Sequence, residues 1–403
     1  MTAPTRWPLH PLPSTGEALS SWLTRIADAH QLRLDELLAN NLGAYSFDVF
    51  DRTTGGGLDV NPPRELLAAV EQRTGRDRDE LWGMSIAGNS PWLLDDLEPS
   101  DEEDAFNTYV RQHQILLTAR ERPARLTSPW RAWLPREPLR RACPACVVGP
   151  DPVPGLTLVS QLPLTLSCPT HGCYLESAYG VVDTRIIWID GNTAPRPAPP
   201  AVTAMDRRTA DAFSIGIVRL PRRDVHAGIW FRILRTIIDE LSTSVTQART
   251  YAHILRDIWA SIEQPIRGGM SIWRPFEMLN WTTQQRLLEA TAAAITMIED
   301  GAVRAPGMHS ALFLPEPDGS EGDGCAPTTT RAELIDYWKA VVDSFKGVVA
   351  LALADPVQAE MLYRFVSSGP GGADNARRML ADIGISEYAS SQNQDTDRSR
   401  ALE

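Results

Sequence analysis

The sequence predicts a mainly α protein with one small zinc-ribbon-like module that contains short β-strands. Apolar residues recur at helical spacing in the first hundred residues and again beyond residue 222, and two short cysteine motifs lie between these parts. We therefore expect five segments along the chain. They are an N-terminal helix-turn-helix-like region (1–118), a zinc-binding module (119–190), a Pro-rich linker and connector (191–221), a helical C-terminal domain (222–389) and a disordered tail (390–403).

Composition limits the class of protein. A chain of 403 residues with 43% hydrophobic content can bury one or two substantial cores. Its net charge of −12 argues against nonspecific coating of nucleic acid, which depends on neutralising phosphates. Five cysteines, four of them in a metal-binding pattern, suit a reducing compartment better than a disulfide framework does. No apolar run is long enough to span a bilayer and the N-terminus has no secretory pattern, so we expect a cytoplasmic protein.

The N-terminal region contains two similar helical pairs. The first pair is expected at Glu17–Ala29 and at Asp35–Asn41, with a break near His30 and an end at Gly43. The pattern recurs 44 positions later, where Leu66, Leu67 and Val70 match Trp22, Leu23 and Ile26, and Asp79-Glu80-Leu81 matches Asp35-Glu36-Leu37. A turn at Thr74-Gly75 makes the second pair resemble a helix-turn-helix. Short helical pairs are also common packing elements, so DNA reading is one of two interpretations here.

The cysteine motifs predict a zinc site. Cys143, Cys146, Cys168 and His171 offer four ligands in two short loops, which suits tetrahedral Zn²⁺. Four protein ligands leave no open position for water, so the site is expected to be structural. Cys173 either replaces His171 as a ligand or is an ordinary small buried side chain, the interpretation we favour. The insert is expected to be a strand, because its leucines fall on even positions with Cys168: Leu156, Leu158, Leu162, Leu164 and Leu166.

A basic segment precedes the first cysteine motif. Seven arginines and two glutamates lie between Arg120 and Arg141, and this predicts a basic patch beside the metal module. The candidate nucleic-acid contacts are Arg131, Arg136, Arg140 and Arg141. The alternative is a solvated charged face. Trp130 and Trp133 are interpreted as the small core that the metal module shares with its neighbour.

The remaining elements follow from apolar periodicity and caps. Arg232 and Arg235 are expected on the surface of their helix, and the loop 316–328 is expected to be mobile. A strand is expected at Thr184–Ile189. The expected helices are Phe106–Leu117, Asp224–Leu241, Thr282–Ile298 (capped by Thr282-Thr283), a capping-box helix from Thr330 through Phe345, Val357–Val366 and Ala373–Ile383.

The order of these features resembles the TniQ family over about residues 7–180. The resemblance rests on three stretches: Gly16-Glu17-Ala18-Leu19-Ser20-Ser21-Trp22-Leu23, Arg140-Arg141-Ala142-Cys143-Pro144-Ala145-Cys146, and Gln161-Leu162-Pro163-Leu164 leading to Cys168-Pro169-Thr170-His171-Gly172. TniQ proteins, with their larger TnsD relatives, select transposition targets. The resemblance implies the zinc ligands named above, a DNA or RNA-guided target, and recruitment of an AAA+ ATPase regulator and a transposase; a homodimer is left open.

The leading hypothesis is therefore a non-enzymatic adaptor in transposition. The alternative is a stand-alone DNA-binding regulator that is unconnected with transposition. No His-Glu-x-x-His motif, phosphate-binding Gly-rich loop or Gly-x-Ser-x-Gly elbow occurs in the sequence, and the histidines other than His171 are scattered. We expect no catalytic residues.

Overall fold

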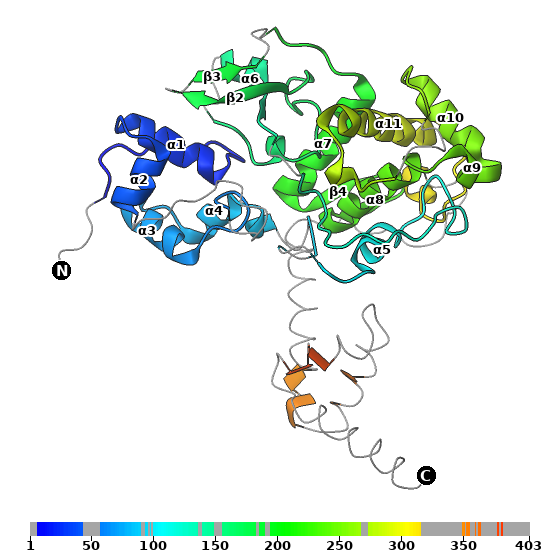
Figure 1. Cartoon of the computed structure of the whole chain (residues 1–403), viewed down its shortest axis with the longest axis horizontal. Coiled ribbons are helices and arrows are strands. Elements are labelled where there is room, and N and C mark those ends of the chain that lie inside the picture. The colour runs from blue at the N-terminus through cyan, green and yellow to red at the C-terminus, as the bar shows by residue number, and fades with distance from the viewer. Residues whose placement is uncertain are drawn as a thin grey trace, which may run out of the picture. The chain divides into compact units, whose positions relative to one another are not determined.

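The computed structural model describes residues 6–42, 57–89, 93–95, 97, 100–135, 139–148, 155–182, 185–189, 194–266, 273–315 and scattered positions between 349 and 381 (Figure 1). The chain divides into two compact units, Met1–Pro317 and Asp318–Glu403. In the second unit, Ala352, Ala359, Leu362 and Leu380 form a small apolar cluster. The expected features at Gly43, Arg136, 316–328, 330–345 and 390–403 lie outside the described residues, as do most of 357–366 and 373–383.

The N-terminal helices form two pairs, as the sequence predicts: α1 (Leu19–Ala29) with α2 (Leu34–Asn41), and α3 (Arg64–Thr74) with α4 (Arg78–Gly83). The two pairs bury a common apolar cluster that includes Trp22, Leu23, Ile26, Leu37, Leu66, Leu67, Val70 and Leu81. Gly75 ends α3 in the left-handed conformation, with φ of 73°, which glycine adopts without a Cβ clash. Both helical pairs predicted from the sequence are therefore confirmed.

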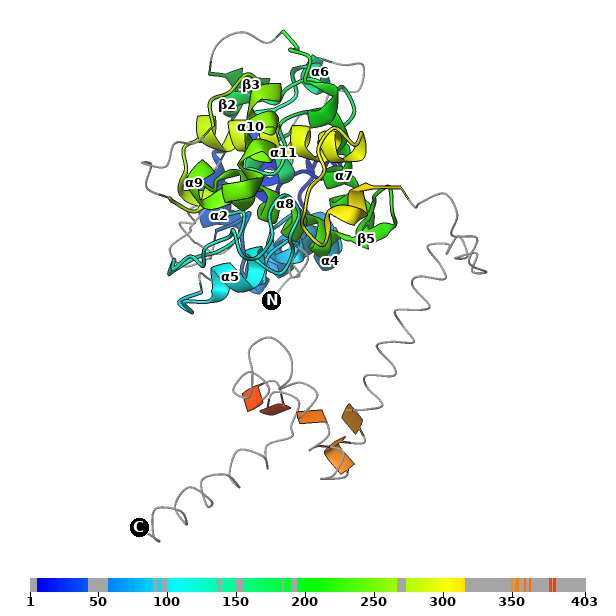
Figure 2. The ribbon, with the colours of Figure 1, turned by 90° about the vertical axis from the view of Figure 1, so that its right-hand side faces the viewer.

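Most of the remaining helices share one larger core. They are α5 (Ala105–Val110), α7 (Pro200–Ile215), α8 (Ala227–Leu241), α9 (Val245–Ala248), α10 (Ala252–Ser261) and α11 (Trp281–Glu299). Helix α11 packs against α7, α8 and α10, and these helices lie together in both views (Figure 1 and Figure 2). Most of the predicted stripe of α8 is buried in this core, at Trp230, Ile233, Leu234, Ile237, Ile238 and Leu241, whereas Ile229, also expected in the stripe, is exposed. Short 3-10 turns occupy Ala87–Asn89, Arg249–Tyr251, Phe276–Met278 and Ser310–Phe313.

Two small antiparallel sheets complete the described fold. The first has the order β1 (Arg141–Ala142), β2 (Glu176–Val182), β3 (Arg185–Trp188), and Arg141 lies opposite Ser177 in its register. Strand β3 confirms the strand expected near 184–189, whereas the sequence analysis missed β2. The second sheet is the hairpin of β4 (Ile217–Arg219) and β5 (Asp224–His226).

Several expected elements differ from the observed ones. The segment 200–215, expected as part of a linker, is helix α7, which buries Val202, Met205, Thr209 and Ala212 at helical spacing. The insert between the cysteine motifs is not a strand. It forms a 3-10 turn at Val159–Gln161, although all five of its predicted inward leucines are buried. Leu156 packs with Ala142 and Ile186, and the other four leucines belong to the large core.

Helix boundaries shift for local reasons. The helix expected at Phe106–Leu117 ends at Val110. Residues 224–226 pair as strand β5, so α8 begins only at Ala227, where the side chain of His226 accepts from the N–H of Gly228. Helix α11 is capped by Asn280 rather than by the expected threonines, because the Asn280 side chain accepts from the N–H of Thr283.

Arg235 is placed differently from the expectation, and it contacts the same carboxylate as a tryptophan that precedes the metal motif. Arg235 is buried inside the large core, where its Nε lies 2.9 Å from Oε1 of Glu277. Trp130 donates through Nε1 to the same carboxylate, and Trp133 donates to the hydroxyl of Tyr109. The tryptophans therefore belong to the core around α8, which also includes Leu158, Leu162, Leu164 and Leu166 of the insert. The metal module thus shares this core with its neighbour, as expected, although the core is large rather than small.

Candidate metal centre

The first two sulfur atoms of the candidate centre come from the start of a short helix. Cys143 directly follows β1, and helix α6 (Pro144–Val148) carries Cys146. The N–H of Cys146 lies 3.4 Å from Sγ of Cys143, so the turn folds around the first sulfur. Pro144 occupies the first position of α6, where its missing N–H costs no helical hydrogen bond. The sequence C-P-x-C thus places both sulfurs on one side of a single turn.

A tight turn supplies the other two ligand atoms. The turn runs from Cys168 to Cys173, and the N–H of Cys168 donates to the carbonyl of Cys173 at 2.8 Å. The N–H of Gly172 donates to the carbonyl of Cys168, also at 2.8 Å, and Gly172 has φ of 62°. A side chain at this left-handed position would strain the turn. His171 therefore stands on a closed loop beside Cys168.

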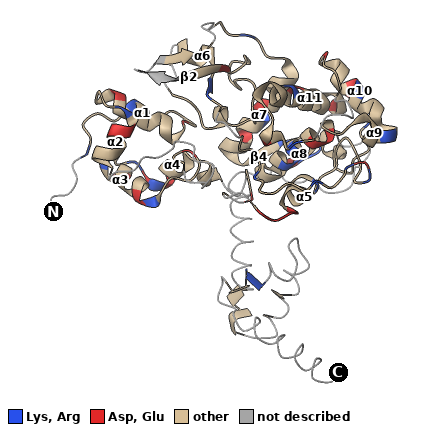
Figure 3. Ribbon diagram, in the orientation of Figure 1, with Lys and Arg blue, Asp and Glu red and all other residues tan. Residues whose placement is uncertain are grey.

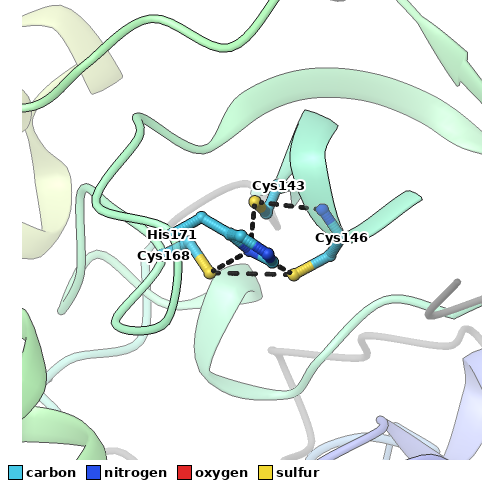
Figure 4. A group of neighbouring side chains, drawn as sticks. All are labelled: Cys143, Cys146, Cys168 and His171. Carbon is cyan, nitrogen blue, oxygen red and sulfur yellow. Dashed lines mark hydrogen bonds between the residues drawn. The ribbon is translucent and has the colours of Figure 1, made fainter. Parts of the chain in front are cut away.

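The four ligand atoms come together in space. The sulfurs of Cys143, Cys146 and Cys168 and a nitrogen of His171 all lie within 4.8 Å of one another (Figure 4). Sγ of Cys146 is 3.7 Å from Sγ of Cys168, and Nδ1 of His171 is 3.6, 3.2 and 3.5 Å from the three sulfurs in chain order. A tetrahedron with zinc–sulfur bonds of about 2.3 Å has sulfur–sulfur edges of about 3.8 Å. The cluster has the donor set and the size to hold a metal ion.

Cys173 lies beside this group without belonging to it. Its Sγ is 3.4 Å from Sγ of Cys143, and its side chain is buried. It is not among the four mutually close ligand atoms in the described part of the chain. This arrangement agrees with the interpretation of Cys173 as a small buried side chain packed against the centre.

The ionisation of the sulfurs is shared within the cluster. Hydrogen bonds with Cys146 and then with Cys168 raise the pKa of Cys143. Hydrogen bonds from Cys143 and Cys146 lower the pKa of Cys168. One of the three sulfurs is thus readily deprotonated, whereas deprotonating the others as well is unfavourable without a cation. A divalent cation would make it favourable, because it binds all three as thiolates.

Two buried residues with ionisable side chains, Arg141 and Asp206, bind the backbone around the centre. The guanidinium of Arg141 donates to the carbonyls of Ser160, Leu162 and Thr165 at 3.0, 2.8 and 2.7 Å. It also lies over the ring of Trp281 on α11, at 4.2 Å from the centroid. Burial lowers the pKa of Arg141 to about 9, and the nearby Asp206 opposes this shift. Arg141 therefore fixes the insert and joins the metal module to the helical core.

Asp206 on α7 supports the segment before Cys168, and the sequence analysis did not identify it. It is fully buried, and burial raises its pKa to about 7. Its Oδ2 accepts from the N–H groups of Leu166 and Ser167 and from the hydroxyl of Ser167. The helical spacing of apolar residues between 202 and 212 could have revealed α7, but no local pattern connects Asp206 with Ser167.

The arginines before the first cysteine do not form one surface patch. Arg141 and Arg122 are buried, and Arg122 lies 3.6 Å from both Asp239 and Glu240. Arg131 is half-buried and donates to the carbonyl of Leu97, whereas Arg140 is exposed. The expected patch is therefore wrong for Arg122 and Arg141. Nucleic-acid binding by Arg131, Arg136 and Arg140 remains a prediction.

The N-terminal helical pairs present mixed charge. Acidic and basic residues both occur on α1 and α3, whereas α2 carries acidic residues only (Figure 3). Arg33 pairs with Asp35 at 2.8 Å and Arg78 pairs with Glu71 at 2.5 Å, all on partly or fully exposed side chains. Such pairs contribute little to stability and leave little net positive field. The described N-terminal helical pairs therefore do not present a predominantly basic surface.

The fold and site define a mainly helical protein with a cysteine–histidine cluster that could hold a metal ion. Residues 8–175 match the family model for TniQ. Residues 8–175 are thus similar to TniQ proteins, and the matched stretch covers the N-terminal helical pairs and all four candidate ligands. The searches of curated proteins and of solved structures found no match. None of the described helices is long and apolar enough to cross a membrane.

Proposed function

We propose that this protein is a non-enzymatic target-selection adaptor in DNA transposition. It links a DNA or ribonucleoprotein target to an AAA+ ATPase regulator and a transposase. Similarity to TniQ proteins, which select transposition targets, supports the adaptor over the stand-alone DNA-binding regulator. The family match over residues 8–175 is the observation that carries the proposal.

A single structural zinc ion in the cluster of Cys143, Cys146, Cys168 and His171 is part of this proposal. Three observations support it: the Cys₃His donor set, the tetrahedral edge lengths and the two tight turns that close around the ligands. With four protein ligands the ion has no open position, so it would hold the module together rather than activate water. The ion itself is therefore proposed to be structural rather than catalytic.

The module is well suited to join surfaces because it is anchored on both sides. The backbone of Gly16 and Ala18 exchanges hydrogen bonds with Leu158 and Leu156, which ties the N-terminal helices to the insert. Arg141 and Asp206 tie the same module to α11 and α7. The module thus holds the N-terminal helices and the large helical core in a fixed relation, so that partners bound to each would be held in a defined arrangement.

A pull-down of the tagged full-length chain from its native cells tests the proposal. Mass spectrometry should recover an AAA+ ATPase or a transposase, and sequencing should recover a defined DNA or guide RNA. The matched control is the Cys146→Ser variant, which should lose these partners together with its metal. Recovery of DNA without either protein would favour the stand-alone regulator and would contradict the adaptor.

A further inference from the structure

The turn of the β4–β5 hairpin carries a cluster of exposed arginines. Arg219 ends β4, and Arg222 and Arg223 lie in the turn before Asp224 begins β5. All three arginine side chains are exposed, Arg219 by 90%. Asp224, at 3.8 Å from Arg219, is the one carboxylate paired with them among the described residues. Since exposed pairs of this length are weak, the cluster presents nearly all of its positive charge to solvent.

The backbone that carries these arginines is held rigidly. Ile217, Val218 and Arg219 pair in register with His226, Val225 and Asp224. Val218, Leu220 and Val225 are buried in or against the large core. The N–H of Arg222 donates to the carbonyl of Leu312 at 3.2 Å, and the N–H of Leu220 donates to the carbonyl of Arg223 at 3.3 Å. A partner would have to order only the side chains, which reduces the entropic cost of binding.

We propose that the β4–β5 hairpin binds the phosphate backbone of duplex DNA. A chain with a net charge of −12 disfavours nonspecific binding of a polyanion, so DNA is expected to bind where positive charge is concentrated. Guanidinium groups bind phosphate oxygens in a bidentate geometry. A two-stranded antiparallel ribbon is also narrow enough to enter the major groove of B-DNA while its turn meets the backbone.

The hairpin lies outside residues 8–175, so the family match does not assign it a role. This inference deepens the proposed function, on which it rests for the identity of the ligand, by naming a DNA-contact surface in the helical core. It makes a distinct claim, because phosphate contact at the hairpin requires neither an ATPase nor a transposase. The two ideas therefore have separate experimental readouts.

The test measures binding of the full chain to a mixed-sequence DNA duplex of about 30 base pairs by fluorescence anisotropy across a salt series. The variant carries Arg219→Gln, Arg222→Gln and Arg223→Gln. The matched control carries Arg256→Gln, Arg274→Gln and Arg286→Gln, which removes the same charge from exposed arginines elsewhere. The hairpin variant should lose about 10-fold to 100-fold in affinity, and its slope of log affinity against log salt should flatten by about 2 to 3. The control should keep the slope of the unaltered chain.

Three outcomes would overturn the inference. The first is equal affinity and slope in the hairpin variant and the unaltered chain, or no duplex binding by the unaltered chain. The second is an equal loss in the hairpin and control variants, which would mean a general charge effect. The third is retained DNA binding with loss of binding to polyglutamate, which would assign the hairpin to an acidic protein segment. Melting temperatures of both variants verify that folding is unchanged, and none of these outcomes alters the partners recovered in the pull-down.

Discussion

Oδ2 of Asp206 on α7 lies 2.6 Å from both the backbone nitrogen and the hydroxyl oxygen of Ser167, the residue before Cys168. The N–H of Leu166 donates to the same oxygen at 3.1 Å. One buried carboxylate of the helical core thus binds the segment that leads to Cys168, the third candidate ligand. The segment that carries Cys168 is therefore packed into the helical core. Substitutions of the ligands and of the residues that support them can be compared.

The metal centre gives the first prediction. Cys146→Ser should lower the zinc content from about one ion per chain to near zero, because a three-ligand remnant binds far more weakly. Hydrogen-exchange protection should fall at 141–148 and 166–178, where the turns depend on the ion. Cys173→Ser serves as the control and should retain the metal. Loss of zinc in Cys173→Ser with retention in His171→Ala would instead make Cys173 the fourth ligand.

Two neighbouring arginines give the second prediction. Arg141→Met should destabilise the chain by several kcal/mol, about 1–3 kcal/mol for each buried carbonyl that loses its donor. Arg140→Gln, one residue away and exposed, should change stability by less than about 0.5 kcal/mol. Denaturant unfolding of the two variants checks this contrast. Similar destabilisation by both changes would contradict the different roles that their burial assigns.

The third prediction concerns the pH dependence at Asp59. Burial raises the pKa of Asp59 to about 6 from 3.8, against hydrogen bonds from Ser20 and Gln161 that lower it. The folded state therefore holds a proton that the unfolded state has lost between these values, so Asp59 makes folding less favourable as pH rises from about 4 to about 6. Asp59→Asn should remove this dependence.

The expected size of the Asp59 effect is about 3 kcal/mol, at about 1.4 kcal/mol for each pKa unit. The difference in unfolding free energy between Asp59→Asn and the unaltered chain should shift by that amount in favour of the variant between pH 4 and pH 7. Denaturant titrations at both pH values measure it, and pH effects elsewhere cancel in the difference. A constant difference would show that Asp59 stays ionised in the folded chain.

The buried pair of Arg235 and Glu277 gives the fourth prediction. Glu277 accepts from Arg235, from the indole of Trp130 and from the N–H of Trp133. Glu277→Ala should cost about 3–5 kcal/mol, because it leaves the Arg235 charge buried and unpaired. Adding Arg235→Met should recover part of this loss. A double variant as unstable as the sum of both single changes would show that the two residues do not act as a pair.

Local patterns carried much of the fold prediction. The stripes of α1, α3 and α8 and the C-x-x-C and C-x-x-H spacings involve residues within one or two turns of chain, where geometry follows directly from the backbone. The prediction failed where local signals compete. Alternating leucines in the insert satisfy a strand, yet the residues belong to two different apolar clusters, so the chain bends through a 3-10 turn.

By itself, the sequence determined the helical class, the four candidate ligands and the TniQ resemblance, because each depends on residues close together in the chain. The tertiary structure alone decided which charges are buried. Arg140 and Arg141 are adjacent, yet one is exposed and the other is enclosed by the insert and Trp281. Arg235 needs Glu277, 42 residues away, and Ser167 needs Asp206, 39 residues away. In these pairs a charge is buried where a segment remote in the sequence provides its partner. A local sequence pattern does not predict such a tertiary contact.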